Sequence, residues 1–272
     1  MNWKHLCAVA GGGVVAAVAT AWAVGASAGE GLWPVANDLR SRRIVDLTHA
    51  FDVGTPRWKG FPAMKRRVLY TYARDGFFAE EFAHVGQYGT HVDPPGHFHK
   101  GKRMVDAIAP REMILPLVVV DMHERATKDP DCELTMADMK AWEQRHGPVP
   151  AGAFVALRTD WSKRWPHQNQ MLNKDATGVA HYPGWGLETI KYLCERRRIT
   201  AIGHETTDTD RGLSTSKGEY PCETYLLGQD RYQIELLTGL DQVPAVDAMA
   251  IVTWPKPKHG SGFPARVLAI LP

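Results

Sequence analysis

The chain has 272 residues, of which 44% are hydrophobic and 23% are charged, a composition typical of a folded globular protein. Its 32 basic and 30 acidic residues give a formal net charge of only +2, so the charge does not favour nucleic acid or an anionic membrane surface as a partner. We therefore expect one large domain and no nucleic-acid partner.

The N-terminal residues 1–28 have the features of a secretory signal peptide. A short positive segment containing Lys4 precedes an apolar run at 6–24, and Ala26-Ser27-Ala28 fits a small-residue cleavage site. A retained anchor helix is the alternative, because the run approaches the ~20 residues that span a bilayer. The sequence predicts cleavage, a mature domain at 29–272 in the periplasm or outside the cell, and no stable membrane association afterwards.

The rest of the chain reads as a mixed α/β domain. A capping-box pattern predicts a helix from Thr135 to about Arg145, and an amphipathic pattern predicts another at 186–197. Residues 160–184 have little periodicity and form either a long loop or an insertion over the active site. β-Branched or alternating content predicts strands at 44–48, 66–72, 78–85, 117–122, 153–158, 199–203, 231–237, 248–254 and 265–271.

The segment 87–98, Gln-Tyr-Gly-Thr-His-Val-Asp-Pro-Pro-Gly-His-Phe, is the most informative part of the chain. In an extended backbone Gln87, His91 and Asp93 point to the same face. The Pro-Pro-Gly turn ends the strand and can bring His97 back toward them. Imidazole and carboxylate ligands suit zinc, or manganese where oxygen ligands dominate. The pattern therefore predicts a divalent metal site, with histidines that are merely hydrogen-bonded as the alternative.

The pattern Gly-Thr-His-x-Asp-x-Pro-x-His-Phe at 89–98 resembles the signature of the metal-dependent cyclase family, which includes bacterial kynurenine formamidases and isatin hydrolases. The resemblance implies a single α/β domain of the swivelling β/β/α type, with a central mixed, barrel-like sheet flanked by helices, and a homo-oligomer. Supporting stretches occur in the family's order: Asp46-Leu47-Thr48, Thr55-Pro56-Arg57-Trp58, Tyr182-Pro183-Gly184-Trp185, Ala201-Ile202-Gly203 and Ile234-Glu235-Leu236-Leu237.

The same resemblance implies a set of metal ligands. His91 and Asp93 match ligands of a two-metal arrangement in the formamidases, and Asp93 and Glu235 match its bridging carboxylates. Gln87 and Glu223 stand where the formamidases have metal-binding histidines. Both changes replace a nitrogen donor by an oxygen donor, which favours a single, harder ion over two zinc ions. We expect one or two divalent ions, manganese or zinc, per chain.

His97 matches the family residue that donates and accepts protons. We expect metal-activated water, with His97 as general acid and base, to hydrolyse a C–N amide bond of a small aromatic or heterocyclic substrate, either an arylformamide or a cyclic amide. A lyase, dehydratase or lactonase on the same scaffold is one alternative, and a binding protein without catalysis is another. No G-x-S-x-G, Walker or G-x-G-x-x-G motif with the required context is present.

Four residues are candidates for substrate contact. Trp58 falls close to an aromatic residue that lines the pocket in the family, and Phe61 and Trp185 could stack on the same ring. His204 begins a polar segment, 204–210, that either contacts the substrate and ligands or forms a hydrogen-bonded turn.

The mature chain retains Cys132, Cys194 and Cys222, an odd number that allows at most one internal disulfide. Cys222, next to Glu223, could be a nucleophile, but a small buried residue is the favoured interpretation.

Overall fold

The computed structural model describes residues 31–58 and 60–272, so the predicted signal peptide at 1–28 lies outside the described residues. The chain divides into two units, 1–38 and 39–272, and helix α1 (Trp33–Ser41), which begins in the first, has no buried residue. Among the described residues no helix is both long enough and apolar enough to cross a membrane.

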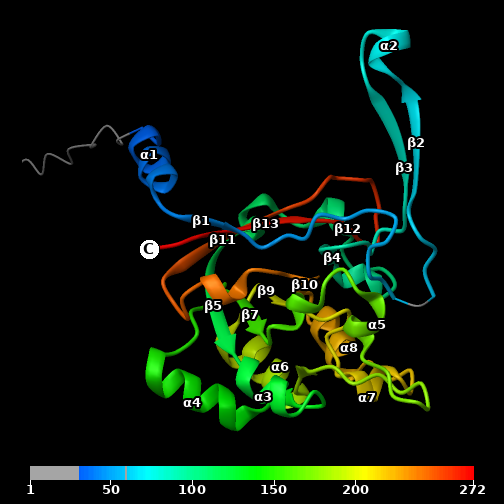
Figure 1. The fold of residues 1–272 in the computed structure, drawn as a ribbon. Helices are drawn as coiled ribbons and strands as arrows, with labels where there is room; N and C mark the ends of the chain where they lie inside the picture. Colours follow the sequence, from blue (N-terminus) through cyan, green and yellow to red (C-terminus); the bar gives the residue numbers. More distant parts are fainter. Residues whose placement is uncertain (1–30, 59) are drawn as a thin grey trace, which may run out of the picture. The chain divides into compact units, whose positions relative to one another are not determined.

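A nine-stranded sheet forms the centre of the second unit as far as it is described, in the order β1-β13-β11-β5-β7-β9-β10-β4-β12 (Figure 1). The four strands from β5 to β10 in that order are parallel, and every other pairing is antiparallel. Their bounds are β1 (Ile44–Asp46), β4 (His91–Asp93), β5 (Ile114–Asp121), β7 (Phe154–Arg158), β9 (Ala201–His204), β10 (Tyr232–Glu235), β11 (Ala248–Thr253), β12 (Phe263–Pro264) and β13 (Arg266–Ile270).

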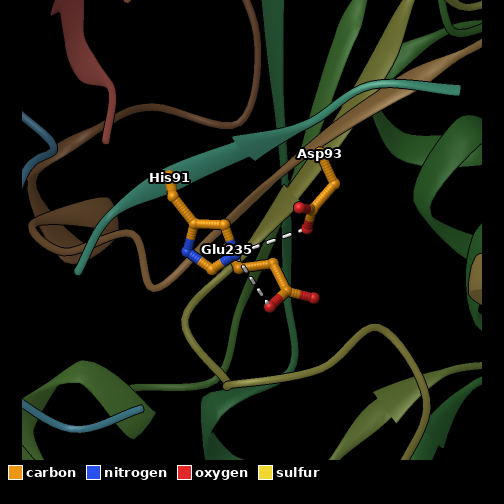
Figure 2. Close-up of side chains that lie close together, drawn as sticks. All are labelled: His91, Asp93 and Glu235. Atoms are coloured by element: carbon orange, nitrogen blue, oxygen red, sulfur yellow. Dashed lines mark ion pairs between the residues drawn. The ribbon is translucent and has the colours of Figure 1, made fainter. Parts of the chain in front are cut away.

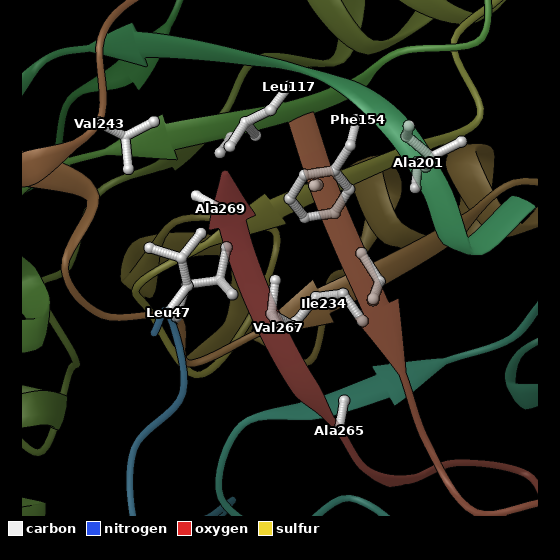
Figure 3. Close-up of a cluster of buried hydrophobic side chains, with 14 of the residues drawn as sticks. Leu47, Leu117, Phe154, Ala201, Ile234, Val243, Ala265, Val267 and Ala269 are labelled. Atoms are coloured by element: carbon white, nitrogen blue, oxygen red, sulfur yellow. The ribbon is translucent and has the colours of Figure 1, made fainter. Parts of the chain in front are cut away.

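The two faces of this sheet carry separate hydrophobic cores, because side chains alternate along each strand. In β5, Leu117 and Val119 enter the first core, where strand side chains pack against one another (Figure 3). Val118 and Val120 enter the second core. The second core is covered by helices, of which the main ones are α3 (His123–Lys128), α4 (Met136–His146), α6 (Leu187–Tyr192) and α8 (Pro221–Gly228).

The expected α/β class, with a central mixed sheet and flanking helices, is confirmed. Each segment predicted as a strand overlaps an observed one. The segments 66–72 and 78–85 form a separate hairpin of β2 (Lys65–Tyr70) and β3 (Ala79–Ala83), with α2 (Tyr72–Asp75) at its tip. The capping box of α4 is present: the Thr135 hydroxyl accepts from the Asp138 amide, and the Asp138 carboxylate accepts from the Thr135 amide. The helix predicted at 186–197 is α6 followed by a π-helical turn, η5 (Leu193–Arg197).

The segment 160–184 is an ordered insertion rather than a structureless loop. It contains η4 (Trp161–Arg164) and α5 (Gln168–Leu172), which help to form a third hydrophobic cluster. The Gln168 amide clamps the backbone of Arg57, accepting from its N–H at 2.8 Å and donating to its carbonyl at 2.9 Å. The insertion thereby fixes the segment that carries Arg57 and Trp58.

Shorter elements complete the connections. The pair β6 (Glu133–Leu134) and β8 (Gly184–Trp185) lies beside the second core, and Trp185 is buried within that core. The remaining elements are η1 (Pro95–His97), η2 (Val105–Ala107), η3 (Pro110–Met113), α7 (Gly212–Thr215) and η6 (Leu240–Gln242).

Candidate active site

The site is built on the pairing of β4 with β10. In this antiparallel pair His91 lies opposite Glu235, and Asp93 lies opposite Gln233. Directly opposed residues point to the same face of a sheet, whereas Val92 between them points into the first core. The register therefore gathers an imidazole, two carboxylates and an amide on one face.

His91, Asp93 and Glu235 converge on a single point (Figure 2). The Nε2 atom of His91 lies 3.4 Å from Asp93 Oδ2 and 3.5 Å from Glu235 Oε2, and each residue is at most 5% exposed. The other ring nitrogen, Nδ1, lies 2.7 Å from the Gly89 carbonyl oxygen. Because a carbonyl only accepts, Nδ1 carries a proton, and Nε2 is the ring nitrogen that faces the two carboxylates.

A second group, Asp93, His97 and Glu223, shares the Asp93 carboxylate. His97 reaches it because the chain turns sharply in η1, and its Nε2 lies 3.9 Å from Asp93 Oδ1. A Cβ atom at Gly96 would lie 2.4 Å from the sulfur of Met104 and 3.0 Å from the Arg103 carbonyl oxygen, so a larger residue would have to displace the Met104 side chain. The sequence expectation that the Pro-Pro-Gly turn returns His97 to the strand is confirmed.

Glu223 lies in the first turn of α8. The Asp210 carboxylate fixes this turn by accepting from the backbone N–H groups of Cys222, at 2.9 Å, and of Glu223, at 3.1 Å. Cys222 points the other way, and its thiol donates to the Trp185 carbonyl. Burial raises the pKa of Cys222, which disfavours the thiolate that a nucleophile needs. In the described part of the chain Cys132, Cys194 and Cys222 are unpaired and buried.

The residues fit a divalent cation. Within each of the two groups the ligand atoms lie within 4.8 Å of one another. Three buried carboxylates meet here, and burial of unpaired negative charge is unfavourable unless a cation balances it. One imidazole with several carboxylate oxygens suits manganese as well as zinc.

Gln87 is oriented as a donor. Its Nε2 atom lies 2.7 Å from the Ser261 carbonyl oxygen, 3.2 Å from Asp93 Oδ1 and 3.3 Å from His97 Nδ1. The carbonyl and the carboxylate can only accept, so the amide N–H group faces them. Gln87 is thus oriented as a hydrogen-bond donor in the metal-free structure, and its role as a metal ligand stays a prediction.

The acid groups of the site have perturbed proton affinities. Burial raises the pKa of Glu223 and Glu235 well above the usual range, and the nearby Asp93 charge adds to the effect. Burial also raises the pKa of Asp208 to about 7. Burial opposes ionisation of Asp93 too, but His91 and His97 outweigh it and keep the pKa of Asp93 below its ordinary value. Without a cation, Glu223 and Glu235 therefore bind protons more tightly than ordinary carboxylates do.

A cavity of about 260 Å³ opens onto these residues. The structure places Trp58 and Phe61 in its wall, with their ring centroids 5.1 Å apart. Thr207 and Asp208, from the polar segment 204–210, also line the cavity. Further lining residues that the sequence did not single out for substrate contact are Arg57, Phe98, Tyr220 and Leu236. Arg57 stands in the motif that resembles the family and Asp208 in the polar segment 204–210, whereas no pattern marks Tyr220.

Two residues expected to contact substrate lie elsewhere. Trp185, which is 1% exposed, packs in the second core and does not line the cavity. His204 is also 1% exposed, and its Nε2 lies 3.4 Å from Glu235 Oε1, behind the carboxylate rather than in the cavity wall. Burial lowers the pKa of His204 to about 3, so its ring is neutral. We correct both expectations, because each side chain belongs to the protein interior.

Known proteins resemble this chain over most of its length. The Cyclase family profile matches residues 45–211. The chain belongs to the cyclase family. An isatin hydrolase of Roseibium aggregatum is 33% identical over 243 residues, covering 84% of this chain and 92% of the relative. The structure of isatin hydrolase A from Ralstonia solanacearum has a TM-score of 0.83 and 34% identity, covering 90% of this chain and 99% of that one.

A third similar structure, of an isatin hydrolase bound to the product analogue thioisatinate, has a TM-score of 0.83 and 30% identity and covers 89% of this chain and 97% of that one. This cyclase-family chain is accordingly an amidohydrolase that acts on carbon–nitrogen bonds other than peptide bonds.

Metal should stabilise the protein more at pH 8 than at pH 6. In the folded, metal-free protein the pKa values of Glu223 and Glu235 are raised above the ~4.3 of an unfolded glutamate, so both carboxyl groups bind protons more tightly than in the unfolded chain. The stability from these protons is present below that value and is lost as the pH rises. A cation must displace them, so its affinity should rise about tenfold per pH unit for each proton displaced. Thermal unfolding with Mn²⁺ or chelator measures this; an equal shift at both pH values would contradict it.

Proposed function

We propose that this protein is a metal-dependent hydrolase that opens the cyclic amide of isatin or a closely related aromatic lactam. The observation that carries the proposal is the convergence of His91, Asp93 and Glu235 beside His97, at the floor of a cavity walled by aromatic rings. The similarity to isatin hydrolases over most of the chain supports the choice of a lactam over a linear formamide.

The chain supplies the proton transfers of this reaction. A divalent cation held by His91, Asp93 and Glu235 would polarise the amide carbonyl and make water more acidic. His97 is partly exposed to the cavity and lies beside Asp93, so its imidazole can take a proton from water and return it to the departing nitrogen. Gln87 Nε2 lies 3.3 Å from Nδ1 of the His97 ring, and Nε2 of the ring is the nitrogen that lies near Asp93, so contacts on both sides hold the ring in place.

The cavity wall suits a flat aromatic substrate. Trp58 and Phe98 are 39% and 37% exposed, which leaves ring surface free to stack on a ligand. Arg57 brings a cation to the same wall, and ring opening of a lactam creates a carboxylate that a guanidinium can bind. The aromatic wall thus binds the aromatic ring of the substrate, and Arg57 stabilises the carboxylate of the ring-opened product.

Replacement of His97 and of Asp93 should have different effects. The His97→Ala variant should lose 10²–10⁴-fold in kcat on isatin, the range for a general acid–base residue, with its metal content largely intact. Asp93 belongs to both ligand groups, so Asp93→Ala should lose metal and activity together. Metal analysis and absorbance assays of ring opening measure both.

His146→Ala is the control for these variants, because His146 is exposed at the end of α4 and should be neutral. Equal metal loss in the His97→Ala and Asp93→Ala variants would refute the division of roles. Turnover of a lactone or an N-formyl arylamine, with none of isatin, would replace the proposed substrate class.

We also propose that the protein is exported to the periplasm or secreted, on the basis of the charged, apolar and small-residue segments at 1–28. Expression of the full gene in a Gram-negative host should yield a product that begins at or near Gly29. Intact-mass measurement of the purified protein tests this, and a full-length cytoplasmic product would contradict it.

A homodimer built through the β2–β3 hairpin is a further part of the proposal. The hairpin exposes five aromatic residues: Tyr70, Tyr72, Phe77, Phe78 and Phe82. A fully buried aromatic side chain buries ~150–250 Å² of surface, so five rings that are about half exposed can bury roughly 500 Å² per copy. A symmetric dimer would then bury about 1,000 Å² in total, which is the lower bound for a specific interface. Cross-strand pairs, Arg66 with Glu80 and Arg67 with Glu81, cancel the nearby charges and allow a second copy to approach.

The mass of the protein in solution should be that of a dimer, and Phe77→Glu with Phe82→Glu should convert it to a monomer. Light scattering coupled to gel filtration measures the mass. Val53→Glu, at a residue equally exposed outside the hairpin, is the control. A monomeric wild-type protein, or a dimer unaffected by the double change, would contradict the proposal.

A further inference from the structure

The aromatic wall of the cavity is a compact turn between Thr55 and Phe61. The Arg57 guanidinium closes this turn by donating to the carbonyl oxygens of Thr55, at 3.2 Å, and of Phe61, at 3.1 Å. The Phe61 amide donates to the Trp58 carbonyl at 3.0 Å, and a Cβ atom at Gly60 would lie 1.5 Å from the Trp58 ring. The Trp58 ring is therefore folded back on its own turn, so a shift of the turn moves the whole wall.

This turn is attached to the rest of the chain mainly through one side chain. Gln168 Oε1 accepts from the Arg57 N–H at 2.8 Å, and Gln168 Nε2 donates to the Arg57 carbonyl at 2.9 Å. Among the described residues of 56–61, no other backbone group hydrogen-bonds to a part of the chain beyond 52–61. Gln168 thus takes the place of a neighbouring strand, and it determines where the turn lies.

Gln168 is itself held in place from the central sheet. It is the first residue of α5, and the indole N–H of Trp161 donates to the Met171 carbonyl in that helix at 2.8 Å. The buried carboxylate of Glu205, directly after β9, accepts from the Trp161 backbone N–H at 3.2 Å and from the Ser162 hydroxyl at 2.7 Å. A continuous series of contacts therefore runs from the end of β9 through the insertion to the aromatic wall.

Trp58 and Tyr220 separate the main cavity from a smaller one. Both residues line the cavity of about 260 Å³ and also a second cavity of about 50 Å³, whose other walls come from the insertion, including Leu172 and Ala180, and from Thr215 of α7. The Trp58 and Tyr220 side chains also contact each other. A displacement of the Trp58 ring would join the two cavities and give space for a substituent on the substrate ring.

We propose that Gln168 is a positioning residue that sets substrate specificity: by holding Trp58 beside Tyr220, it keeps the smaller cavity closed and excludes aromatic lactams that carry a bulky ring substituent. This inference rests on the proposed function, because it concerns which aromatic lactams the enzyme opens. Gln168 contacts no candidate metal ligand, so its replacement should widen the cavity while the metal and His97 stay in place.

The Gln168→Leu variant removes both hydrogen bonds with little change in side-chain volume. The KM for isatin should rise about tenfold while kcat changes less than about twofold, because the wall binds the ring less well in the ground state and in the transition state alike. The loss in kcat/KM should be smaller, or reversed, for isatins that carry bromine on the aromatic ring. Steady-state kinetics measures both. Gln168→Glu, which keeps the acceptor and removes the donor, should give a smaller change in the same direction.

Hydrogen–deuterium exchange followed by mass spectrometry tests the positioning without an activity assay. Peptides that cover 55–61 should exchange at least about tenfold faster in Gln168→Leu, whereas peptides that cover 87–98 and 231–237 should be unchanged. Gln170→Leu is the matched control, because Gln170 is exposed on the same short helix and should alter neither exchange nor kinetics.

Unchanged exchange at 55–61 in a folded Gln168→Leu variant would overturn the inference, and so would an equal loss of kcat/KM on isatin and on its brominated derivatives. If the leucine variant does not fold, the same two measurements on Gln168→Glu decide the matter. A wild type that leaves isatin intact would refute the proposed substrate, and the exchange at 55–61 would still decide whether Gln168 positions the wall.

Discussion

The register of β4 against β10 is the constraint on which the site depends. It sets His91 opposite Glu235 and Asp93 opposite Gln233, with apolar residues between them in the first core. A slip of one residue would bury the acids among aliphatic side chains and expose the apolar ones to the cavity. The hydrophobic core therefore enforces the geometry of the polar site, because any other register would disrupt both the packing of the core and the grouping of the acids.

The end of β10 shows how firmly this geometry is held. Leu236, directly after Glu235, has a φ of 56°, which costs about 1–3 kcal/mol for a residue of its type. Its N–H donates to the Thr206 carbonyl, and its own carbonyl accepts from the Thr90 hydroxyl at 2.6 Å. These bonds stabilise the turn by which the chain leaves the site after Glu235. The backbone strain is thus offset by contacts with Thr206, after the end of β9, and Thr90, before the start of β4.

Sequence periodicity reveals one half of the site and not the other. His91 and Asp93 are readable because strand side chains alternate with a period of two, and the turn that follows limits where His97 can lie. Their partners come from a strand 140 residues away, so only a family resemblance identifies Glu235. Trp185 and His204 are misplaced for a related reason: an aromatic or polar residue near a motif gives no sign of which face of the sheet it occupies.

The division between rigid strands and loops separates catalysis from specificity. His91, Asp93, Gln233 and Glu235 lie on paired strands, whereas the aromatic wall comes from segments around Trp58 and Tyr220. The first of these segments is fixed by Gln168 in the insertion, which touches no candidate ligand. A change at Gln168 can thus move the aromatic wall without touching His91, Asp93 or Glu235, so the shape of the cavity and the metal-binding residues are held by separate contacts.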